Sequence, residues 1–226
     1  MTTIAMLVFP GFELLDLAGP LDVLARAPQT RVIVVAKTAD AVTPDLAPKV
    51  VPDASFRDAA PCDVLVVPGG HGLSAALADD ETLNYIADAG ARAKHVTSVC
   101  TGALLLGAAG LLRGYRATTH WRYLDLLREF GARPTPERVV EDRNRLTGGG
   151  VTAGIDFALA LVAKTHGPQE AQRIQLGLEY DPAPPFAAGH PRTADAELVG
   201  EYVRATQDRY AERERLVKEA AARRLR

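Results

Sequence analysis

The sequence predicts an α/β fold, a sandwich in which helices cover both faces of a mostly parallel sheet. Apolar runs at residues 3–9, 32–36 and 64–70 lack the alternation of a half-exposed strand, so they indicate strands that are buried on both faces. Helical segments lie between these runs, and such alternation is typical of an α/β sandwich. A chain of 226 residues with 47% hydrophobic residues is long enough to bury the core of this fold.

The elements of the first half are recognisable by their ends. The first strand stops at Pro10-Gly11, and the helix over residues 80–93 follows Asp79 and Asp80, which are suitable N-cap residues. The other elements expected here are a helix over residues 13–27, a strand at 95–99 and a helix at 103–109.

The second half of the sequence predicts a hairpin followed by two helices and a loop. Residues 138–141 and 145–147 predict a small hairpin, and the glycines at 148–150 lead into a helix over residues 151–165. A further helix is expected over residues 168–177, followed by a proline-rich loop at 181–193. We therefore assign residues 1–193 to one α/β domain.

Residues 194–226 form a charged, Ala-rich segment that predicts a helix packed on the domain or extending from it. Its charges are most simply explained as a solvated face. The alternative is a contact with a second copy of the chain, or a lid, along Leu198, Val203, Tyr210 and Leu216.

Composition and charge argue against several classes of partner. The formal net charge of −2, from 26 basic and 28 acidic residues, favours neither nucleic acid nor an anionic membrane. We find no signal-peptide pattern and no apolar run long enough to span a bilayer. The cysteines Cys62 and Cys100 form no disulfide framework and lie in no metal-binding motif. We expect a cytoplasmic protein with free thiols and no metal.

Cys100 lies where a strand is expected to turn sharply into a helix. Ser98 and Gly102 flank it at two positions on either side, as small residues flank the nucleophile of a G-x-S-x-G elbow, although serine replaces the first glycine. The N–H groups at a helix N-terminus favour the thiolate of an exposed sulfur, so we expect a lowered pKa. The pattern alone leaves two interpretations open, a nucleophile and a buried packing residue.

Two comparisons within the sequence sharpen this choice. Cys62, in the stretch APCDVL, is not followed by a small-residue turn or a helix, so we interpret it as structural. Asp16 lies among leucines in ELLDLAGPLDVL, where a carboxylate is buried unless it faces a pocket, whereas Asp22 has no such surroundings. A surface carboxylate at the helix start is the alternative for Asp16. His71 and His120 follow expected strand ends, but the pattern does not pair either with Cys100.

Three blocks occur in the order VLVVPGGHG, TSVCTGALLLGAAGLLRGYRATTHW and LTGGGVTAGIDFAL, with FPGFELLDLAGPLDVL before them and QLGLEYDPAPPF after them. Together they resemble the ThiJ/PfpI group of the class I glutamine amidotransferase-like superfamily, and within it the isocyanide hydratases. The resemblance covers the chain from residue 3 to about residue 190. It implies a three-layer α/β/α sandwich of flavodoxin-like type, a homodimer and no cofactor.

The resemblance also implies a reaction and a set of site residues. By motif position, Cys100 would be the nucleophile and Asp16 the acidic partner in the hydration of an isocyanide to an N-formamide. The residues implied at the pocket are Gly70 and Thr101, through their backbone N–H groups, and Gly149 and Val151 at its border. We hypothesise that Cys100 attacks the terminal carbon, that Asp16 protonates it to leave a thioimidate, and that Asp16 then activates water.

Related functions remain as alternatives. Protease-like and aldehyde-handling relatives commonly carry glutamate in the position of Asp16 and histidine after the cysteine, so Asp16 and Thr101 weaken a peptidase or deglycase function. The sensing domains of AraC-type regulators resemble the same fold, but they are joined to a helix-turn-helix region that we do not find here. In a thiol stress sensor, Cys100 would be oxidised reversibly.

Overall fold

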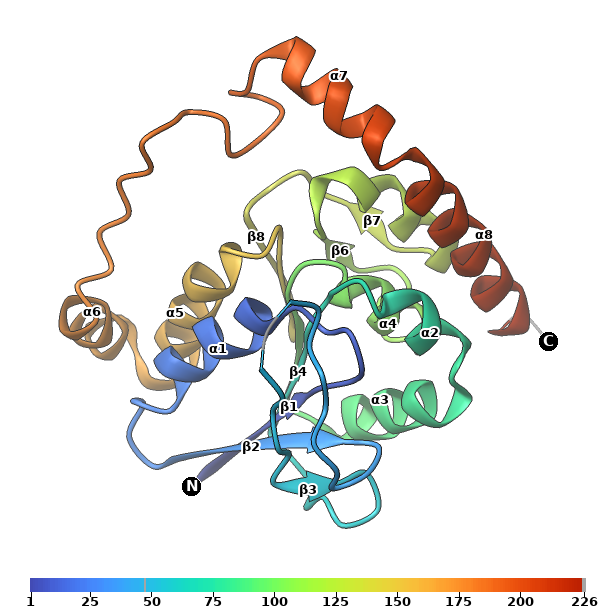
Figure 1. Cartoon of the computed structure of the whole chain (residues 1–226). Helices are drawn as coiled ribbons and strands as arrows, with labels where there is room; N and C mark the ends of the chain where they lie inside the picture. Colours follow the sequence, from blue (N-terminus) through green and yellow to red (C-terminus); the bar gives the residue numbers. More distant parts are fainter. Residues whose placement is uncertain (47, 225–226) are drawn as a thin grey trace.

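A sheet of seven strands forms the middle layer in the part of the chain that the structure describes, residues 1–46 and 48–224 of a computed structural model (Figure 1). In spatial order its strands are β3 (Ala54–Ser55), β2 (Thr30–Ala36), β1 (Thr2–Leu7), β4 (Val64–Val67), β5 (His95–Ser98), β9 (Arg145–Gly148) and β8 (Val139–Asp142). Each pairing is parallel except that of β8 with β9. This arrangement confirms the predicted mostly parallel sheet of flavodoxin-like type.

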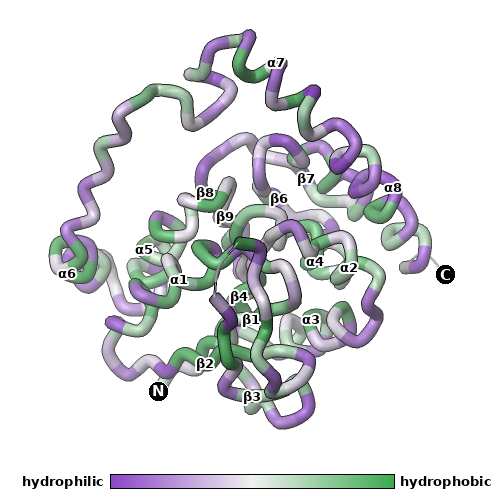
Figure 2. The backbone as a smooth tube through the Cα atoms, in the orientation of Figure 1, coloured by the Kyte–Doolittle hydropathy of each residue, from purple (hydrophilic) through white to green (hydrophobic). Residues whose placement is uncertain are grey.

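The central strands are apolar throughout because both faces of the sheet are covered. All four residues of β4 are buried, as are the last four residues of β1. In Figure 2 these strands are largely green, the colour of hydrophobic residues. Helices on both sides leave these strands no face toward water, which explains why the sequence shows no alternation here.

Two groups of helices cover the sheet, one on each face (Figure 1). The helices of one group are α1 (Leu14–Leu24), α5 (Ala153–His166) and α6 (Pro168–Gly177). Those of the other are α2 (Leu73–Ala78), α3 (Asp80–Arg92) and α4 (Gly102–Ala108). A 3₁₀ helix, η1 (Trp121–Phe130), packs against α4 and lies between the short paired strands β6 (Arg116–Ala117) and β7 (Arg133–Pro134).

The segment after residue 193 folds into two helices, α7 (Ala196–Ala205) and α8 (Gln207–Arg224), rather than one continuous helix. The junction is at Thr206, whose hydroxyl group donates to the carbonyl of Tyr202 at 2.8 Å. Helix α8 packs against α2, α4 and η1, where Val217 and Ala220 are buried. No helix in the described ranges has the length and the apolar character needed to cross a membrane.

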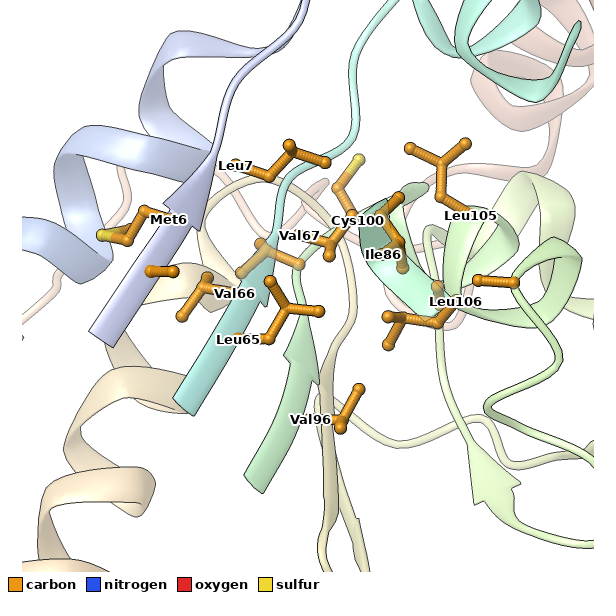
Figure 3. Close-up of a cluster of buried hydrophobic side chains, with 14 of the residues drawn as sticks. Met6, Leu7, Leu65, Val66, Val67, Ile86, Val96, Cys100, Leu105 and Leu106 are labelled. Carbon is orange, nitrogen blue, oxygen red and sulfur yellow. The ribbon is translucent and has the colours of Figure 1, made fainter. Parts of the chain in front are cut away.

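The strand order determines where a site can form. From β1 the chain passes to β2 on one side, whereas β4 lies on the other side of β1, so the order reverses between these strands. Ligands of open α/β sheets bind beyond the carboxyl ends of the strands at such a reversal. Cys100 follows β5 at this end, and in Figure 3 its sulfur points in the direction of the strand arrows.

Candidate active site

Cys100 forms a strained turn between β5 and α4. Its φ is +54°, in the left-handed region that costs a non-glycine residue about 1 to 3 kcal/mol. The turn is possible because glycines stand at the two places where it meets other backbone, Gly102 and Gly69. A Cβ atom on Gly102 would lie 2.1 Å from the carbonyl oxygen of Val67, and one on Gly69 would lie 2.5 Å from the Thr101 nitrogen. The sequence motif therefore corresponds to a real elbow, with the sulfur at the carboxyl end of the sheet.

The Cys100 thiol is buried, and this corrects the expectation of an exposed sulfur with a lowered pKa. Only 6% of the residue is exposed. Burial raises the pKa of Cys100 well above the ordinary value, and the charge of Asp16 raises it further. The Thr101 N–H group and the positive charge of Arg213 lower it, but by less. The expected effect of the helix N-terminus is therefore present, and burial outweighs it.

Asp16 lies on α1 and is completely buried. Burial raises the pKa of Asp16 to about 8, and a hydrogen bond from the Gly69 N–H group to Oδ2, at 2.8 Å, opposes this rise. The Cys100 thiol lies against this carboxyl and affects its pKa, although Asp16 Oδ1 has no partner with full hydrogen-bond geometry among the described residues. At neutral pH the carboxyl therefore holds a proton beside the thiol.

The backbone N–H groups around the elbow differ in whether they reach the Cys100 sulfur. The Gly70 N–H group donates to Thr101 Oγ1 at 3.2 Å, so it is already partnered. The Thr101 N–H group, in contrast, interacts with the Cys100 thiol and lowers its pKa. The Thr119 hydroxyl donates to the Cys100 carbonyl at 2.7 Å and holds the strained residue from the other side. Of the two N–H groups expected in the site, the structure directs that of Thr101 to the sulfur.

A cavity of about 200 Å³ opens above the thiol. It is lined by Glu13, Asp45, Gly70, His71, Cys100, Thr101, His120, Tyr123, Val151, Tyr202, Arg209 and Arg213. Gly149 lines a neighbouring cavity of about 540 Å³, and Val151 and His120 line both. The structure thus brings Cys100, Thr101, Gly70 and Val151 to one cavity, with Asp16 buried beneath it and Gly149 in the adjoining space.

Several residues of this cavity were not assigned to the site from the sequence. Burial lowers the pKa of His120 to about 4, with a smaller effect from Arg213, so the ring is neutral at physiological pH. His71 contacts Asp45 at 2.7 Å and Arg209 at 2.6 Å at the mouth of the cavity. Arg209 and Arg213 lie on α8, in the segment whose charges were most simply explained as a solvated face, and neither was among the residues expected to make a contact.

Cys62 has a different environment. It is buried before β4, its pKa is raised chiefly by burial, and it lines neither of these cavities. Within the described part of the chain, no cluster of histidine, cysteine, aspartate and glutamate side chains has a geometry suited to a metal ion.

Two known proteins are similar to this chain over most of its length. The chain is 51% identical over 198 residues to the isonitrile hydratase of Pseudomonas putida, which covers 88% of this chain and 87% of the relative. It superimposes with a TM-score of 0.91 on the crystal structure of a ThiJ/PfpI family protein from Pseudomonas syringae, with 47% identity, covering 97% of this chain and 90% of that one.

A regulator is similar to part of the chain. The HTH-type transcriptional regulator GbdR of Pseudomonas aeruginosa is 31% identical over 135 residues, which is 59% of this chain and 36% of the regulator.

Residues 2–164 match the DJ-1/PfpI family, which confirms the resemblance inferred from the sequence blocks. With its elbow cysteine, its flavodoxin-like sheet and this match, the chain belongs to the DJ-1/PfpI family.

Proposed function

We propose that this protein is an isocyanide hydratase, an enzyme that adds water to an organic isocyanide and releases an N-formamide. The observation that carries the proposal is the pairing of a strained, buried cysteine with a buried carboxyl that is protonated at neutral pH. The terminal carbon of an isocyanide must gain both a nucleophile and a proton, and Cys100 and Asp16 supply one each. The identity of 51% to an isonitrile hydratase supports the same assignment.

The first step starts from the form of the pair in which Asp16 holds the proton and Cys100 carries the negative charge. This is a minor form at neutral pH, because burial raises the pKa of Cys100 well above its ordinary value. The Thr101 N–H group and Arg213 favour the charge on sulfur. The sulfur forms a bond to the terminal carbon of the isocyanide, and the same carbon takes the proton from Asp16. The result is a covalent thioimidate on Cys100 and a carboxylate at Asp16.

In the second step, water converts the thioimidate to product. The Asp16 carboxylate takes one proton from a water molecule, whose oxygen bonds to the thioimidate carbon. The nitrogen takes the remaining hydroxyl proton as the carbon–sulfur bond breaks. This releases the N-formamide, with Cys100 again a thiolate and Asp16 again protonated. One water is consumed, and nothing is oxidised or reduced.

The cavities suit a small isocyanide with an organic substituent. Tyr123, Val151 and Tyr202 provide apolar and aromatic surface beside Cys100. The adjoining space of about 540 Å³, reached past His120 and Val151, has room for the part of the substrate that does not react. We therefore propose that the isocyanide carbon lies over Cys100 and that the substituent extends toward Gly149.

We also propose that the enzyme acts as a homodimer in the cytoplasm. The family resemblance supports the dimer, and light scattering of the eluted protein during gel filtration tests it. The free state of both cysteines supports a reducing compartment.

Turnover of an aryl isocyanide tests the activity. The purified protein is mixed with the isocyanide, and the N-formamide is quantified by chromatography with mass detection. We expect Cys100→Ala to lose at least about 1000-fold in rate, as removal of an enzyme nucleophile typically does. The matched variant Cys62→Ala should keep full activity, because Cys62 lines neither cavity. No formamide from the unmodified protein would contradict the proposal, and binding without turnover would favour a sensing function.

A further inference from the structure

The C-terminal helix α8 contributes a buried charge to the cavity over Cys100. Arg213 is only 3% exposed, although most charged side chains of this helix face solvent. It lines the same cavity as Cys100 and Thr101. A guanidinium is rarely buried unless a partner compensates its charge, so this position calls for a specific role.

The contacts of Arg213 hold it against the turn that shapes the site. Its Nη2 donates to the Gly70 carbonyl at 2.8 Å, and its guanidinium carbon lies 4.6 Å from the centre of the Tyr123 ring. The same turn supplies the Gly69 N–H group to Asp16 and the Gly70 N–H group to Thr101. Arg213 is thus bonded to the segment that contacts Asp16 and Thr101, the residue that follows Cys100.

The charge of Arg213 remains without a salt-bridge partner among the described residues. Its Nε is also buried with no hydrogen-bond partner in that part of the chain. A buried cation with a spare N–H donor favours an anion nearby. Glu13 and Asp45 also line this cavity, but neither forms a salt bridge with Arg213. The sulfur of Cys100 is the further candidate anion, and the charge of Arg213 lowers its pKa.

We propose that Arg213 is a positioning residue, delivered by α8, that fixes the Gly69–Gly70 turn and stabilises the thiolate of Cys100 with its positive charge. The inference rests on the proposed function only in taking Cys100 as the nucleophile. The family match ends at residue 164, so the residue lies outside the matched domain. The C-terminal helix would then be part of the active site rather than an appendage to it.

Other charged or titratable groups also surround the sulfur, and their effects on the pKa of Cys100 have to be compared with that of Arg213. They are Glu13 and Asp16 at α1, Asp45, His71, His120 and Tyr123 around the cavity, and Tyr202 and Arg209 from the C-terminal helices. Asp16 and Glu13 raise the pKa of Cys100, and the neutral His120 gives the thiolate no positive charge. Arg209 contacts His71 at the mouth of the cavity. Arg213 is therefore the buried cation that acts on the thiol.

The pH dependence of Cys100 alkylation by iodoacetamide tests the proposal. The reaction is followed by intact mass in a Cys62→Ala background, so that one thiol reacts. We expect Arg213→Gln to move the midpoint of the rate profile upward by about one pH unit, which is about tenfold slower alkylation below the midpoint. Arg213→Lys should keep the midpoint close to that of the unmodified protein, because it retains a positive charge.

The control is Arg215→Gln on the same helix, since Arg215 is exposed and pairs with Glu219. It should leave the midpoint unchanged. If Arg213→Gln does not fold, Arg213→Met replaces it, because methionine is an unbranched, apolar side chain that suits a buried position. A folded neutral variant with the midpoint of the unmodified protein would overturn the proposal, as would a lysine variant that shifts as far as the neutral one. Alkylation requires no isocyanide, so this proposal and the proposed function fail separately.

Discussion

Replacement of Asp16 by asparagine should remove a large part of the pH dependence of folding stability. Asparagine has nearly the same size as aspartate, and its carbonyl can still accept the hydrogen bond from the Gly69 N–H group. What it lacks is a titratable proton. The folded protein holds the Asp16 proton up to a pKa of about 8, whereas the unfolded chain releases it near the ordinary value of 3.8.

The magnitude follows from this difference in pKa. Between pH 4 and 8 the unfolded chain binds fewer protons than the folded protein at this position, so the free energy of unfolding falls as the pH rises. The favourable contribution is complete below the unfolded pKa and is lost as the pH rises through the folded one. From pH 5 to pH 8 the loss amounts to about 3 to 4 kcal/mol for one group shifted this far.

Urea unfolding of the unmodified protein and of Asp16→Asn at several pH values from 5 to 8 measures this loss. The difference in the free energy of unfolding between the two proteins should move by that amount in favour of the asparagine variant as the pH rises. The analogous variant Asp22→Asn is the control, because Asp22 is an exposed residue on the same helix. Parallel pH profiles for the Asp16 variant and the unmodified protein would refute a buried, protonated Asp16.

Three further predictions concern the elbow, the neutral histidine and the core. Gly102→Ala should destabilise the fold by about 1 to 3 kcal/mol in urea unfolding, because its Cβ would lie 2.1 Å from the Val67 carbonyl oxygen. The His120 ring should show no titration by NMR between pH 5 and 8, since its pKa is lowered to about 4, and a midpoint above 6 would contradict this. Leu105→Ala should cost about 2 to 5 kcal/mol, whereas Leu176→Ala should change stability little, because Leu105 is fully buried and Leu176 is 82% exposed.

The regular elements could be predicted from the sequence because their signals are local. The continuous apolar run at residues 64–70 marks β4, and the helix expected over residues 168–177 has the bounds of α6. Helix α2 escaped prediction because six residues are too short to show a helical period. Strands β6 and β7, of two residues each, depend on their pairing with one another, and local sequence does not encode that pairing.

The features of the active site that depend on local sequence could also be predicted, and those that depend on distant elements could not. The elbow at Cys100 was recognisable because small residues must flank so tight a turn, and the leucines around Asp16 indicated its burial. The burial of the sulfur was missed, since it depends on elements that are distant in sequence. Arg213 is the clearest case. Its helix looks like a solvated one, and only packing against α2, α4 and η1 reveals which of its charges turns inward.

The intact mass of the protein during turnover tests the covalent mechanism most directly. Protein that is acid-quenched while it converts an aryl isocyanide should carry a mass increase equal to one whole isocyanide, located on the peptide that contains Cys100. The Cys100→Ala variant should show neither this adduct nor formamide. Formamide production by Cys100→Ala at the rate of the unmodified protein, or an adduct on another residue that forms and decays with turnover, would contradict the assignment of Cys100 as the nucleophile.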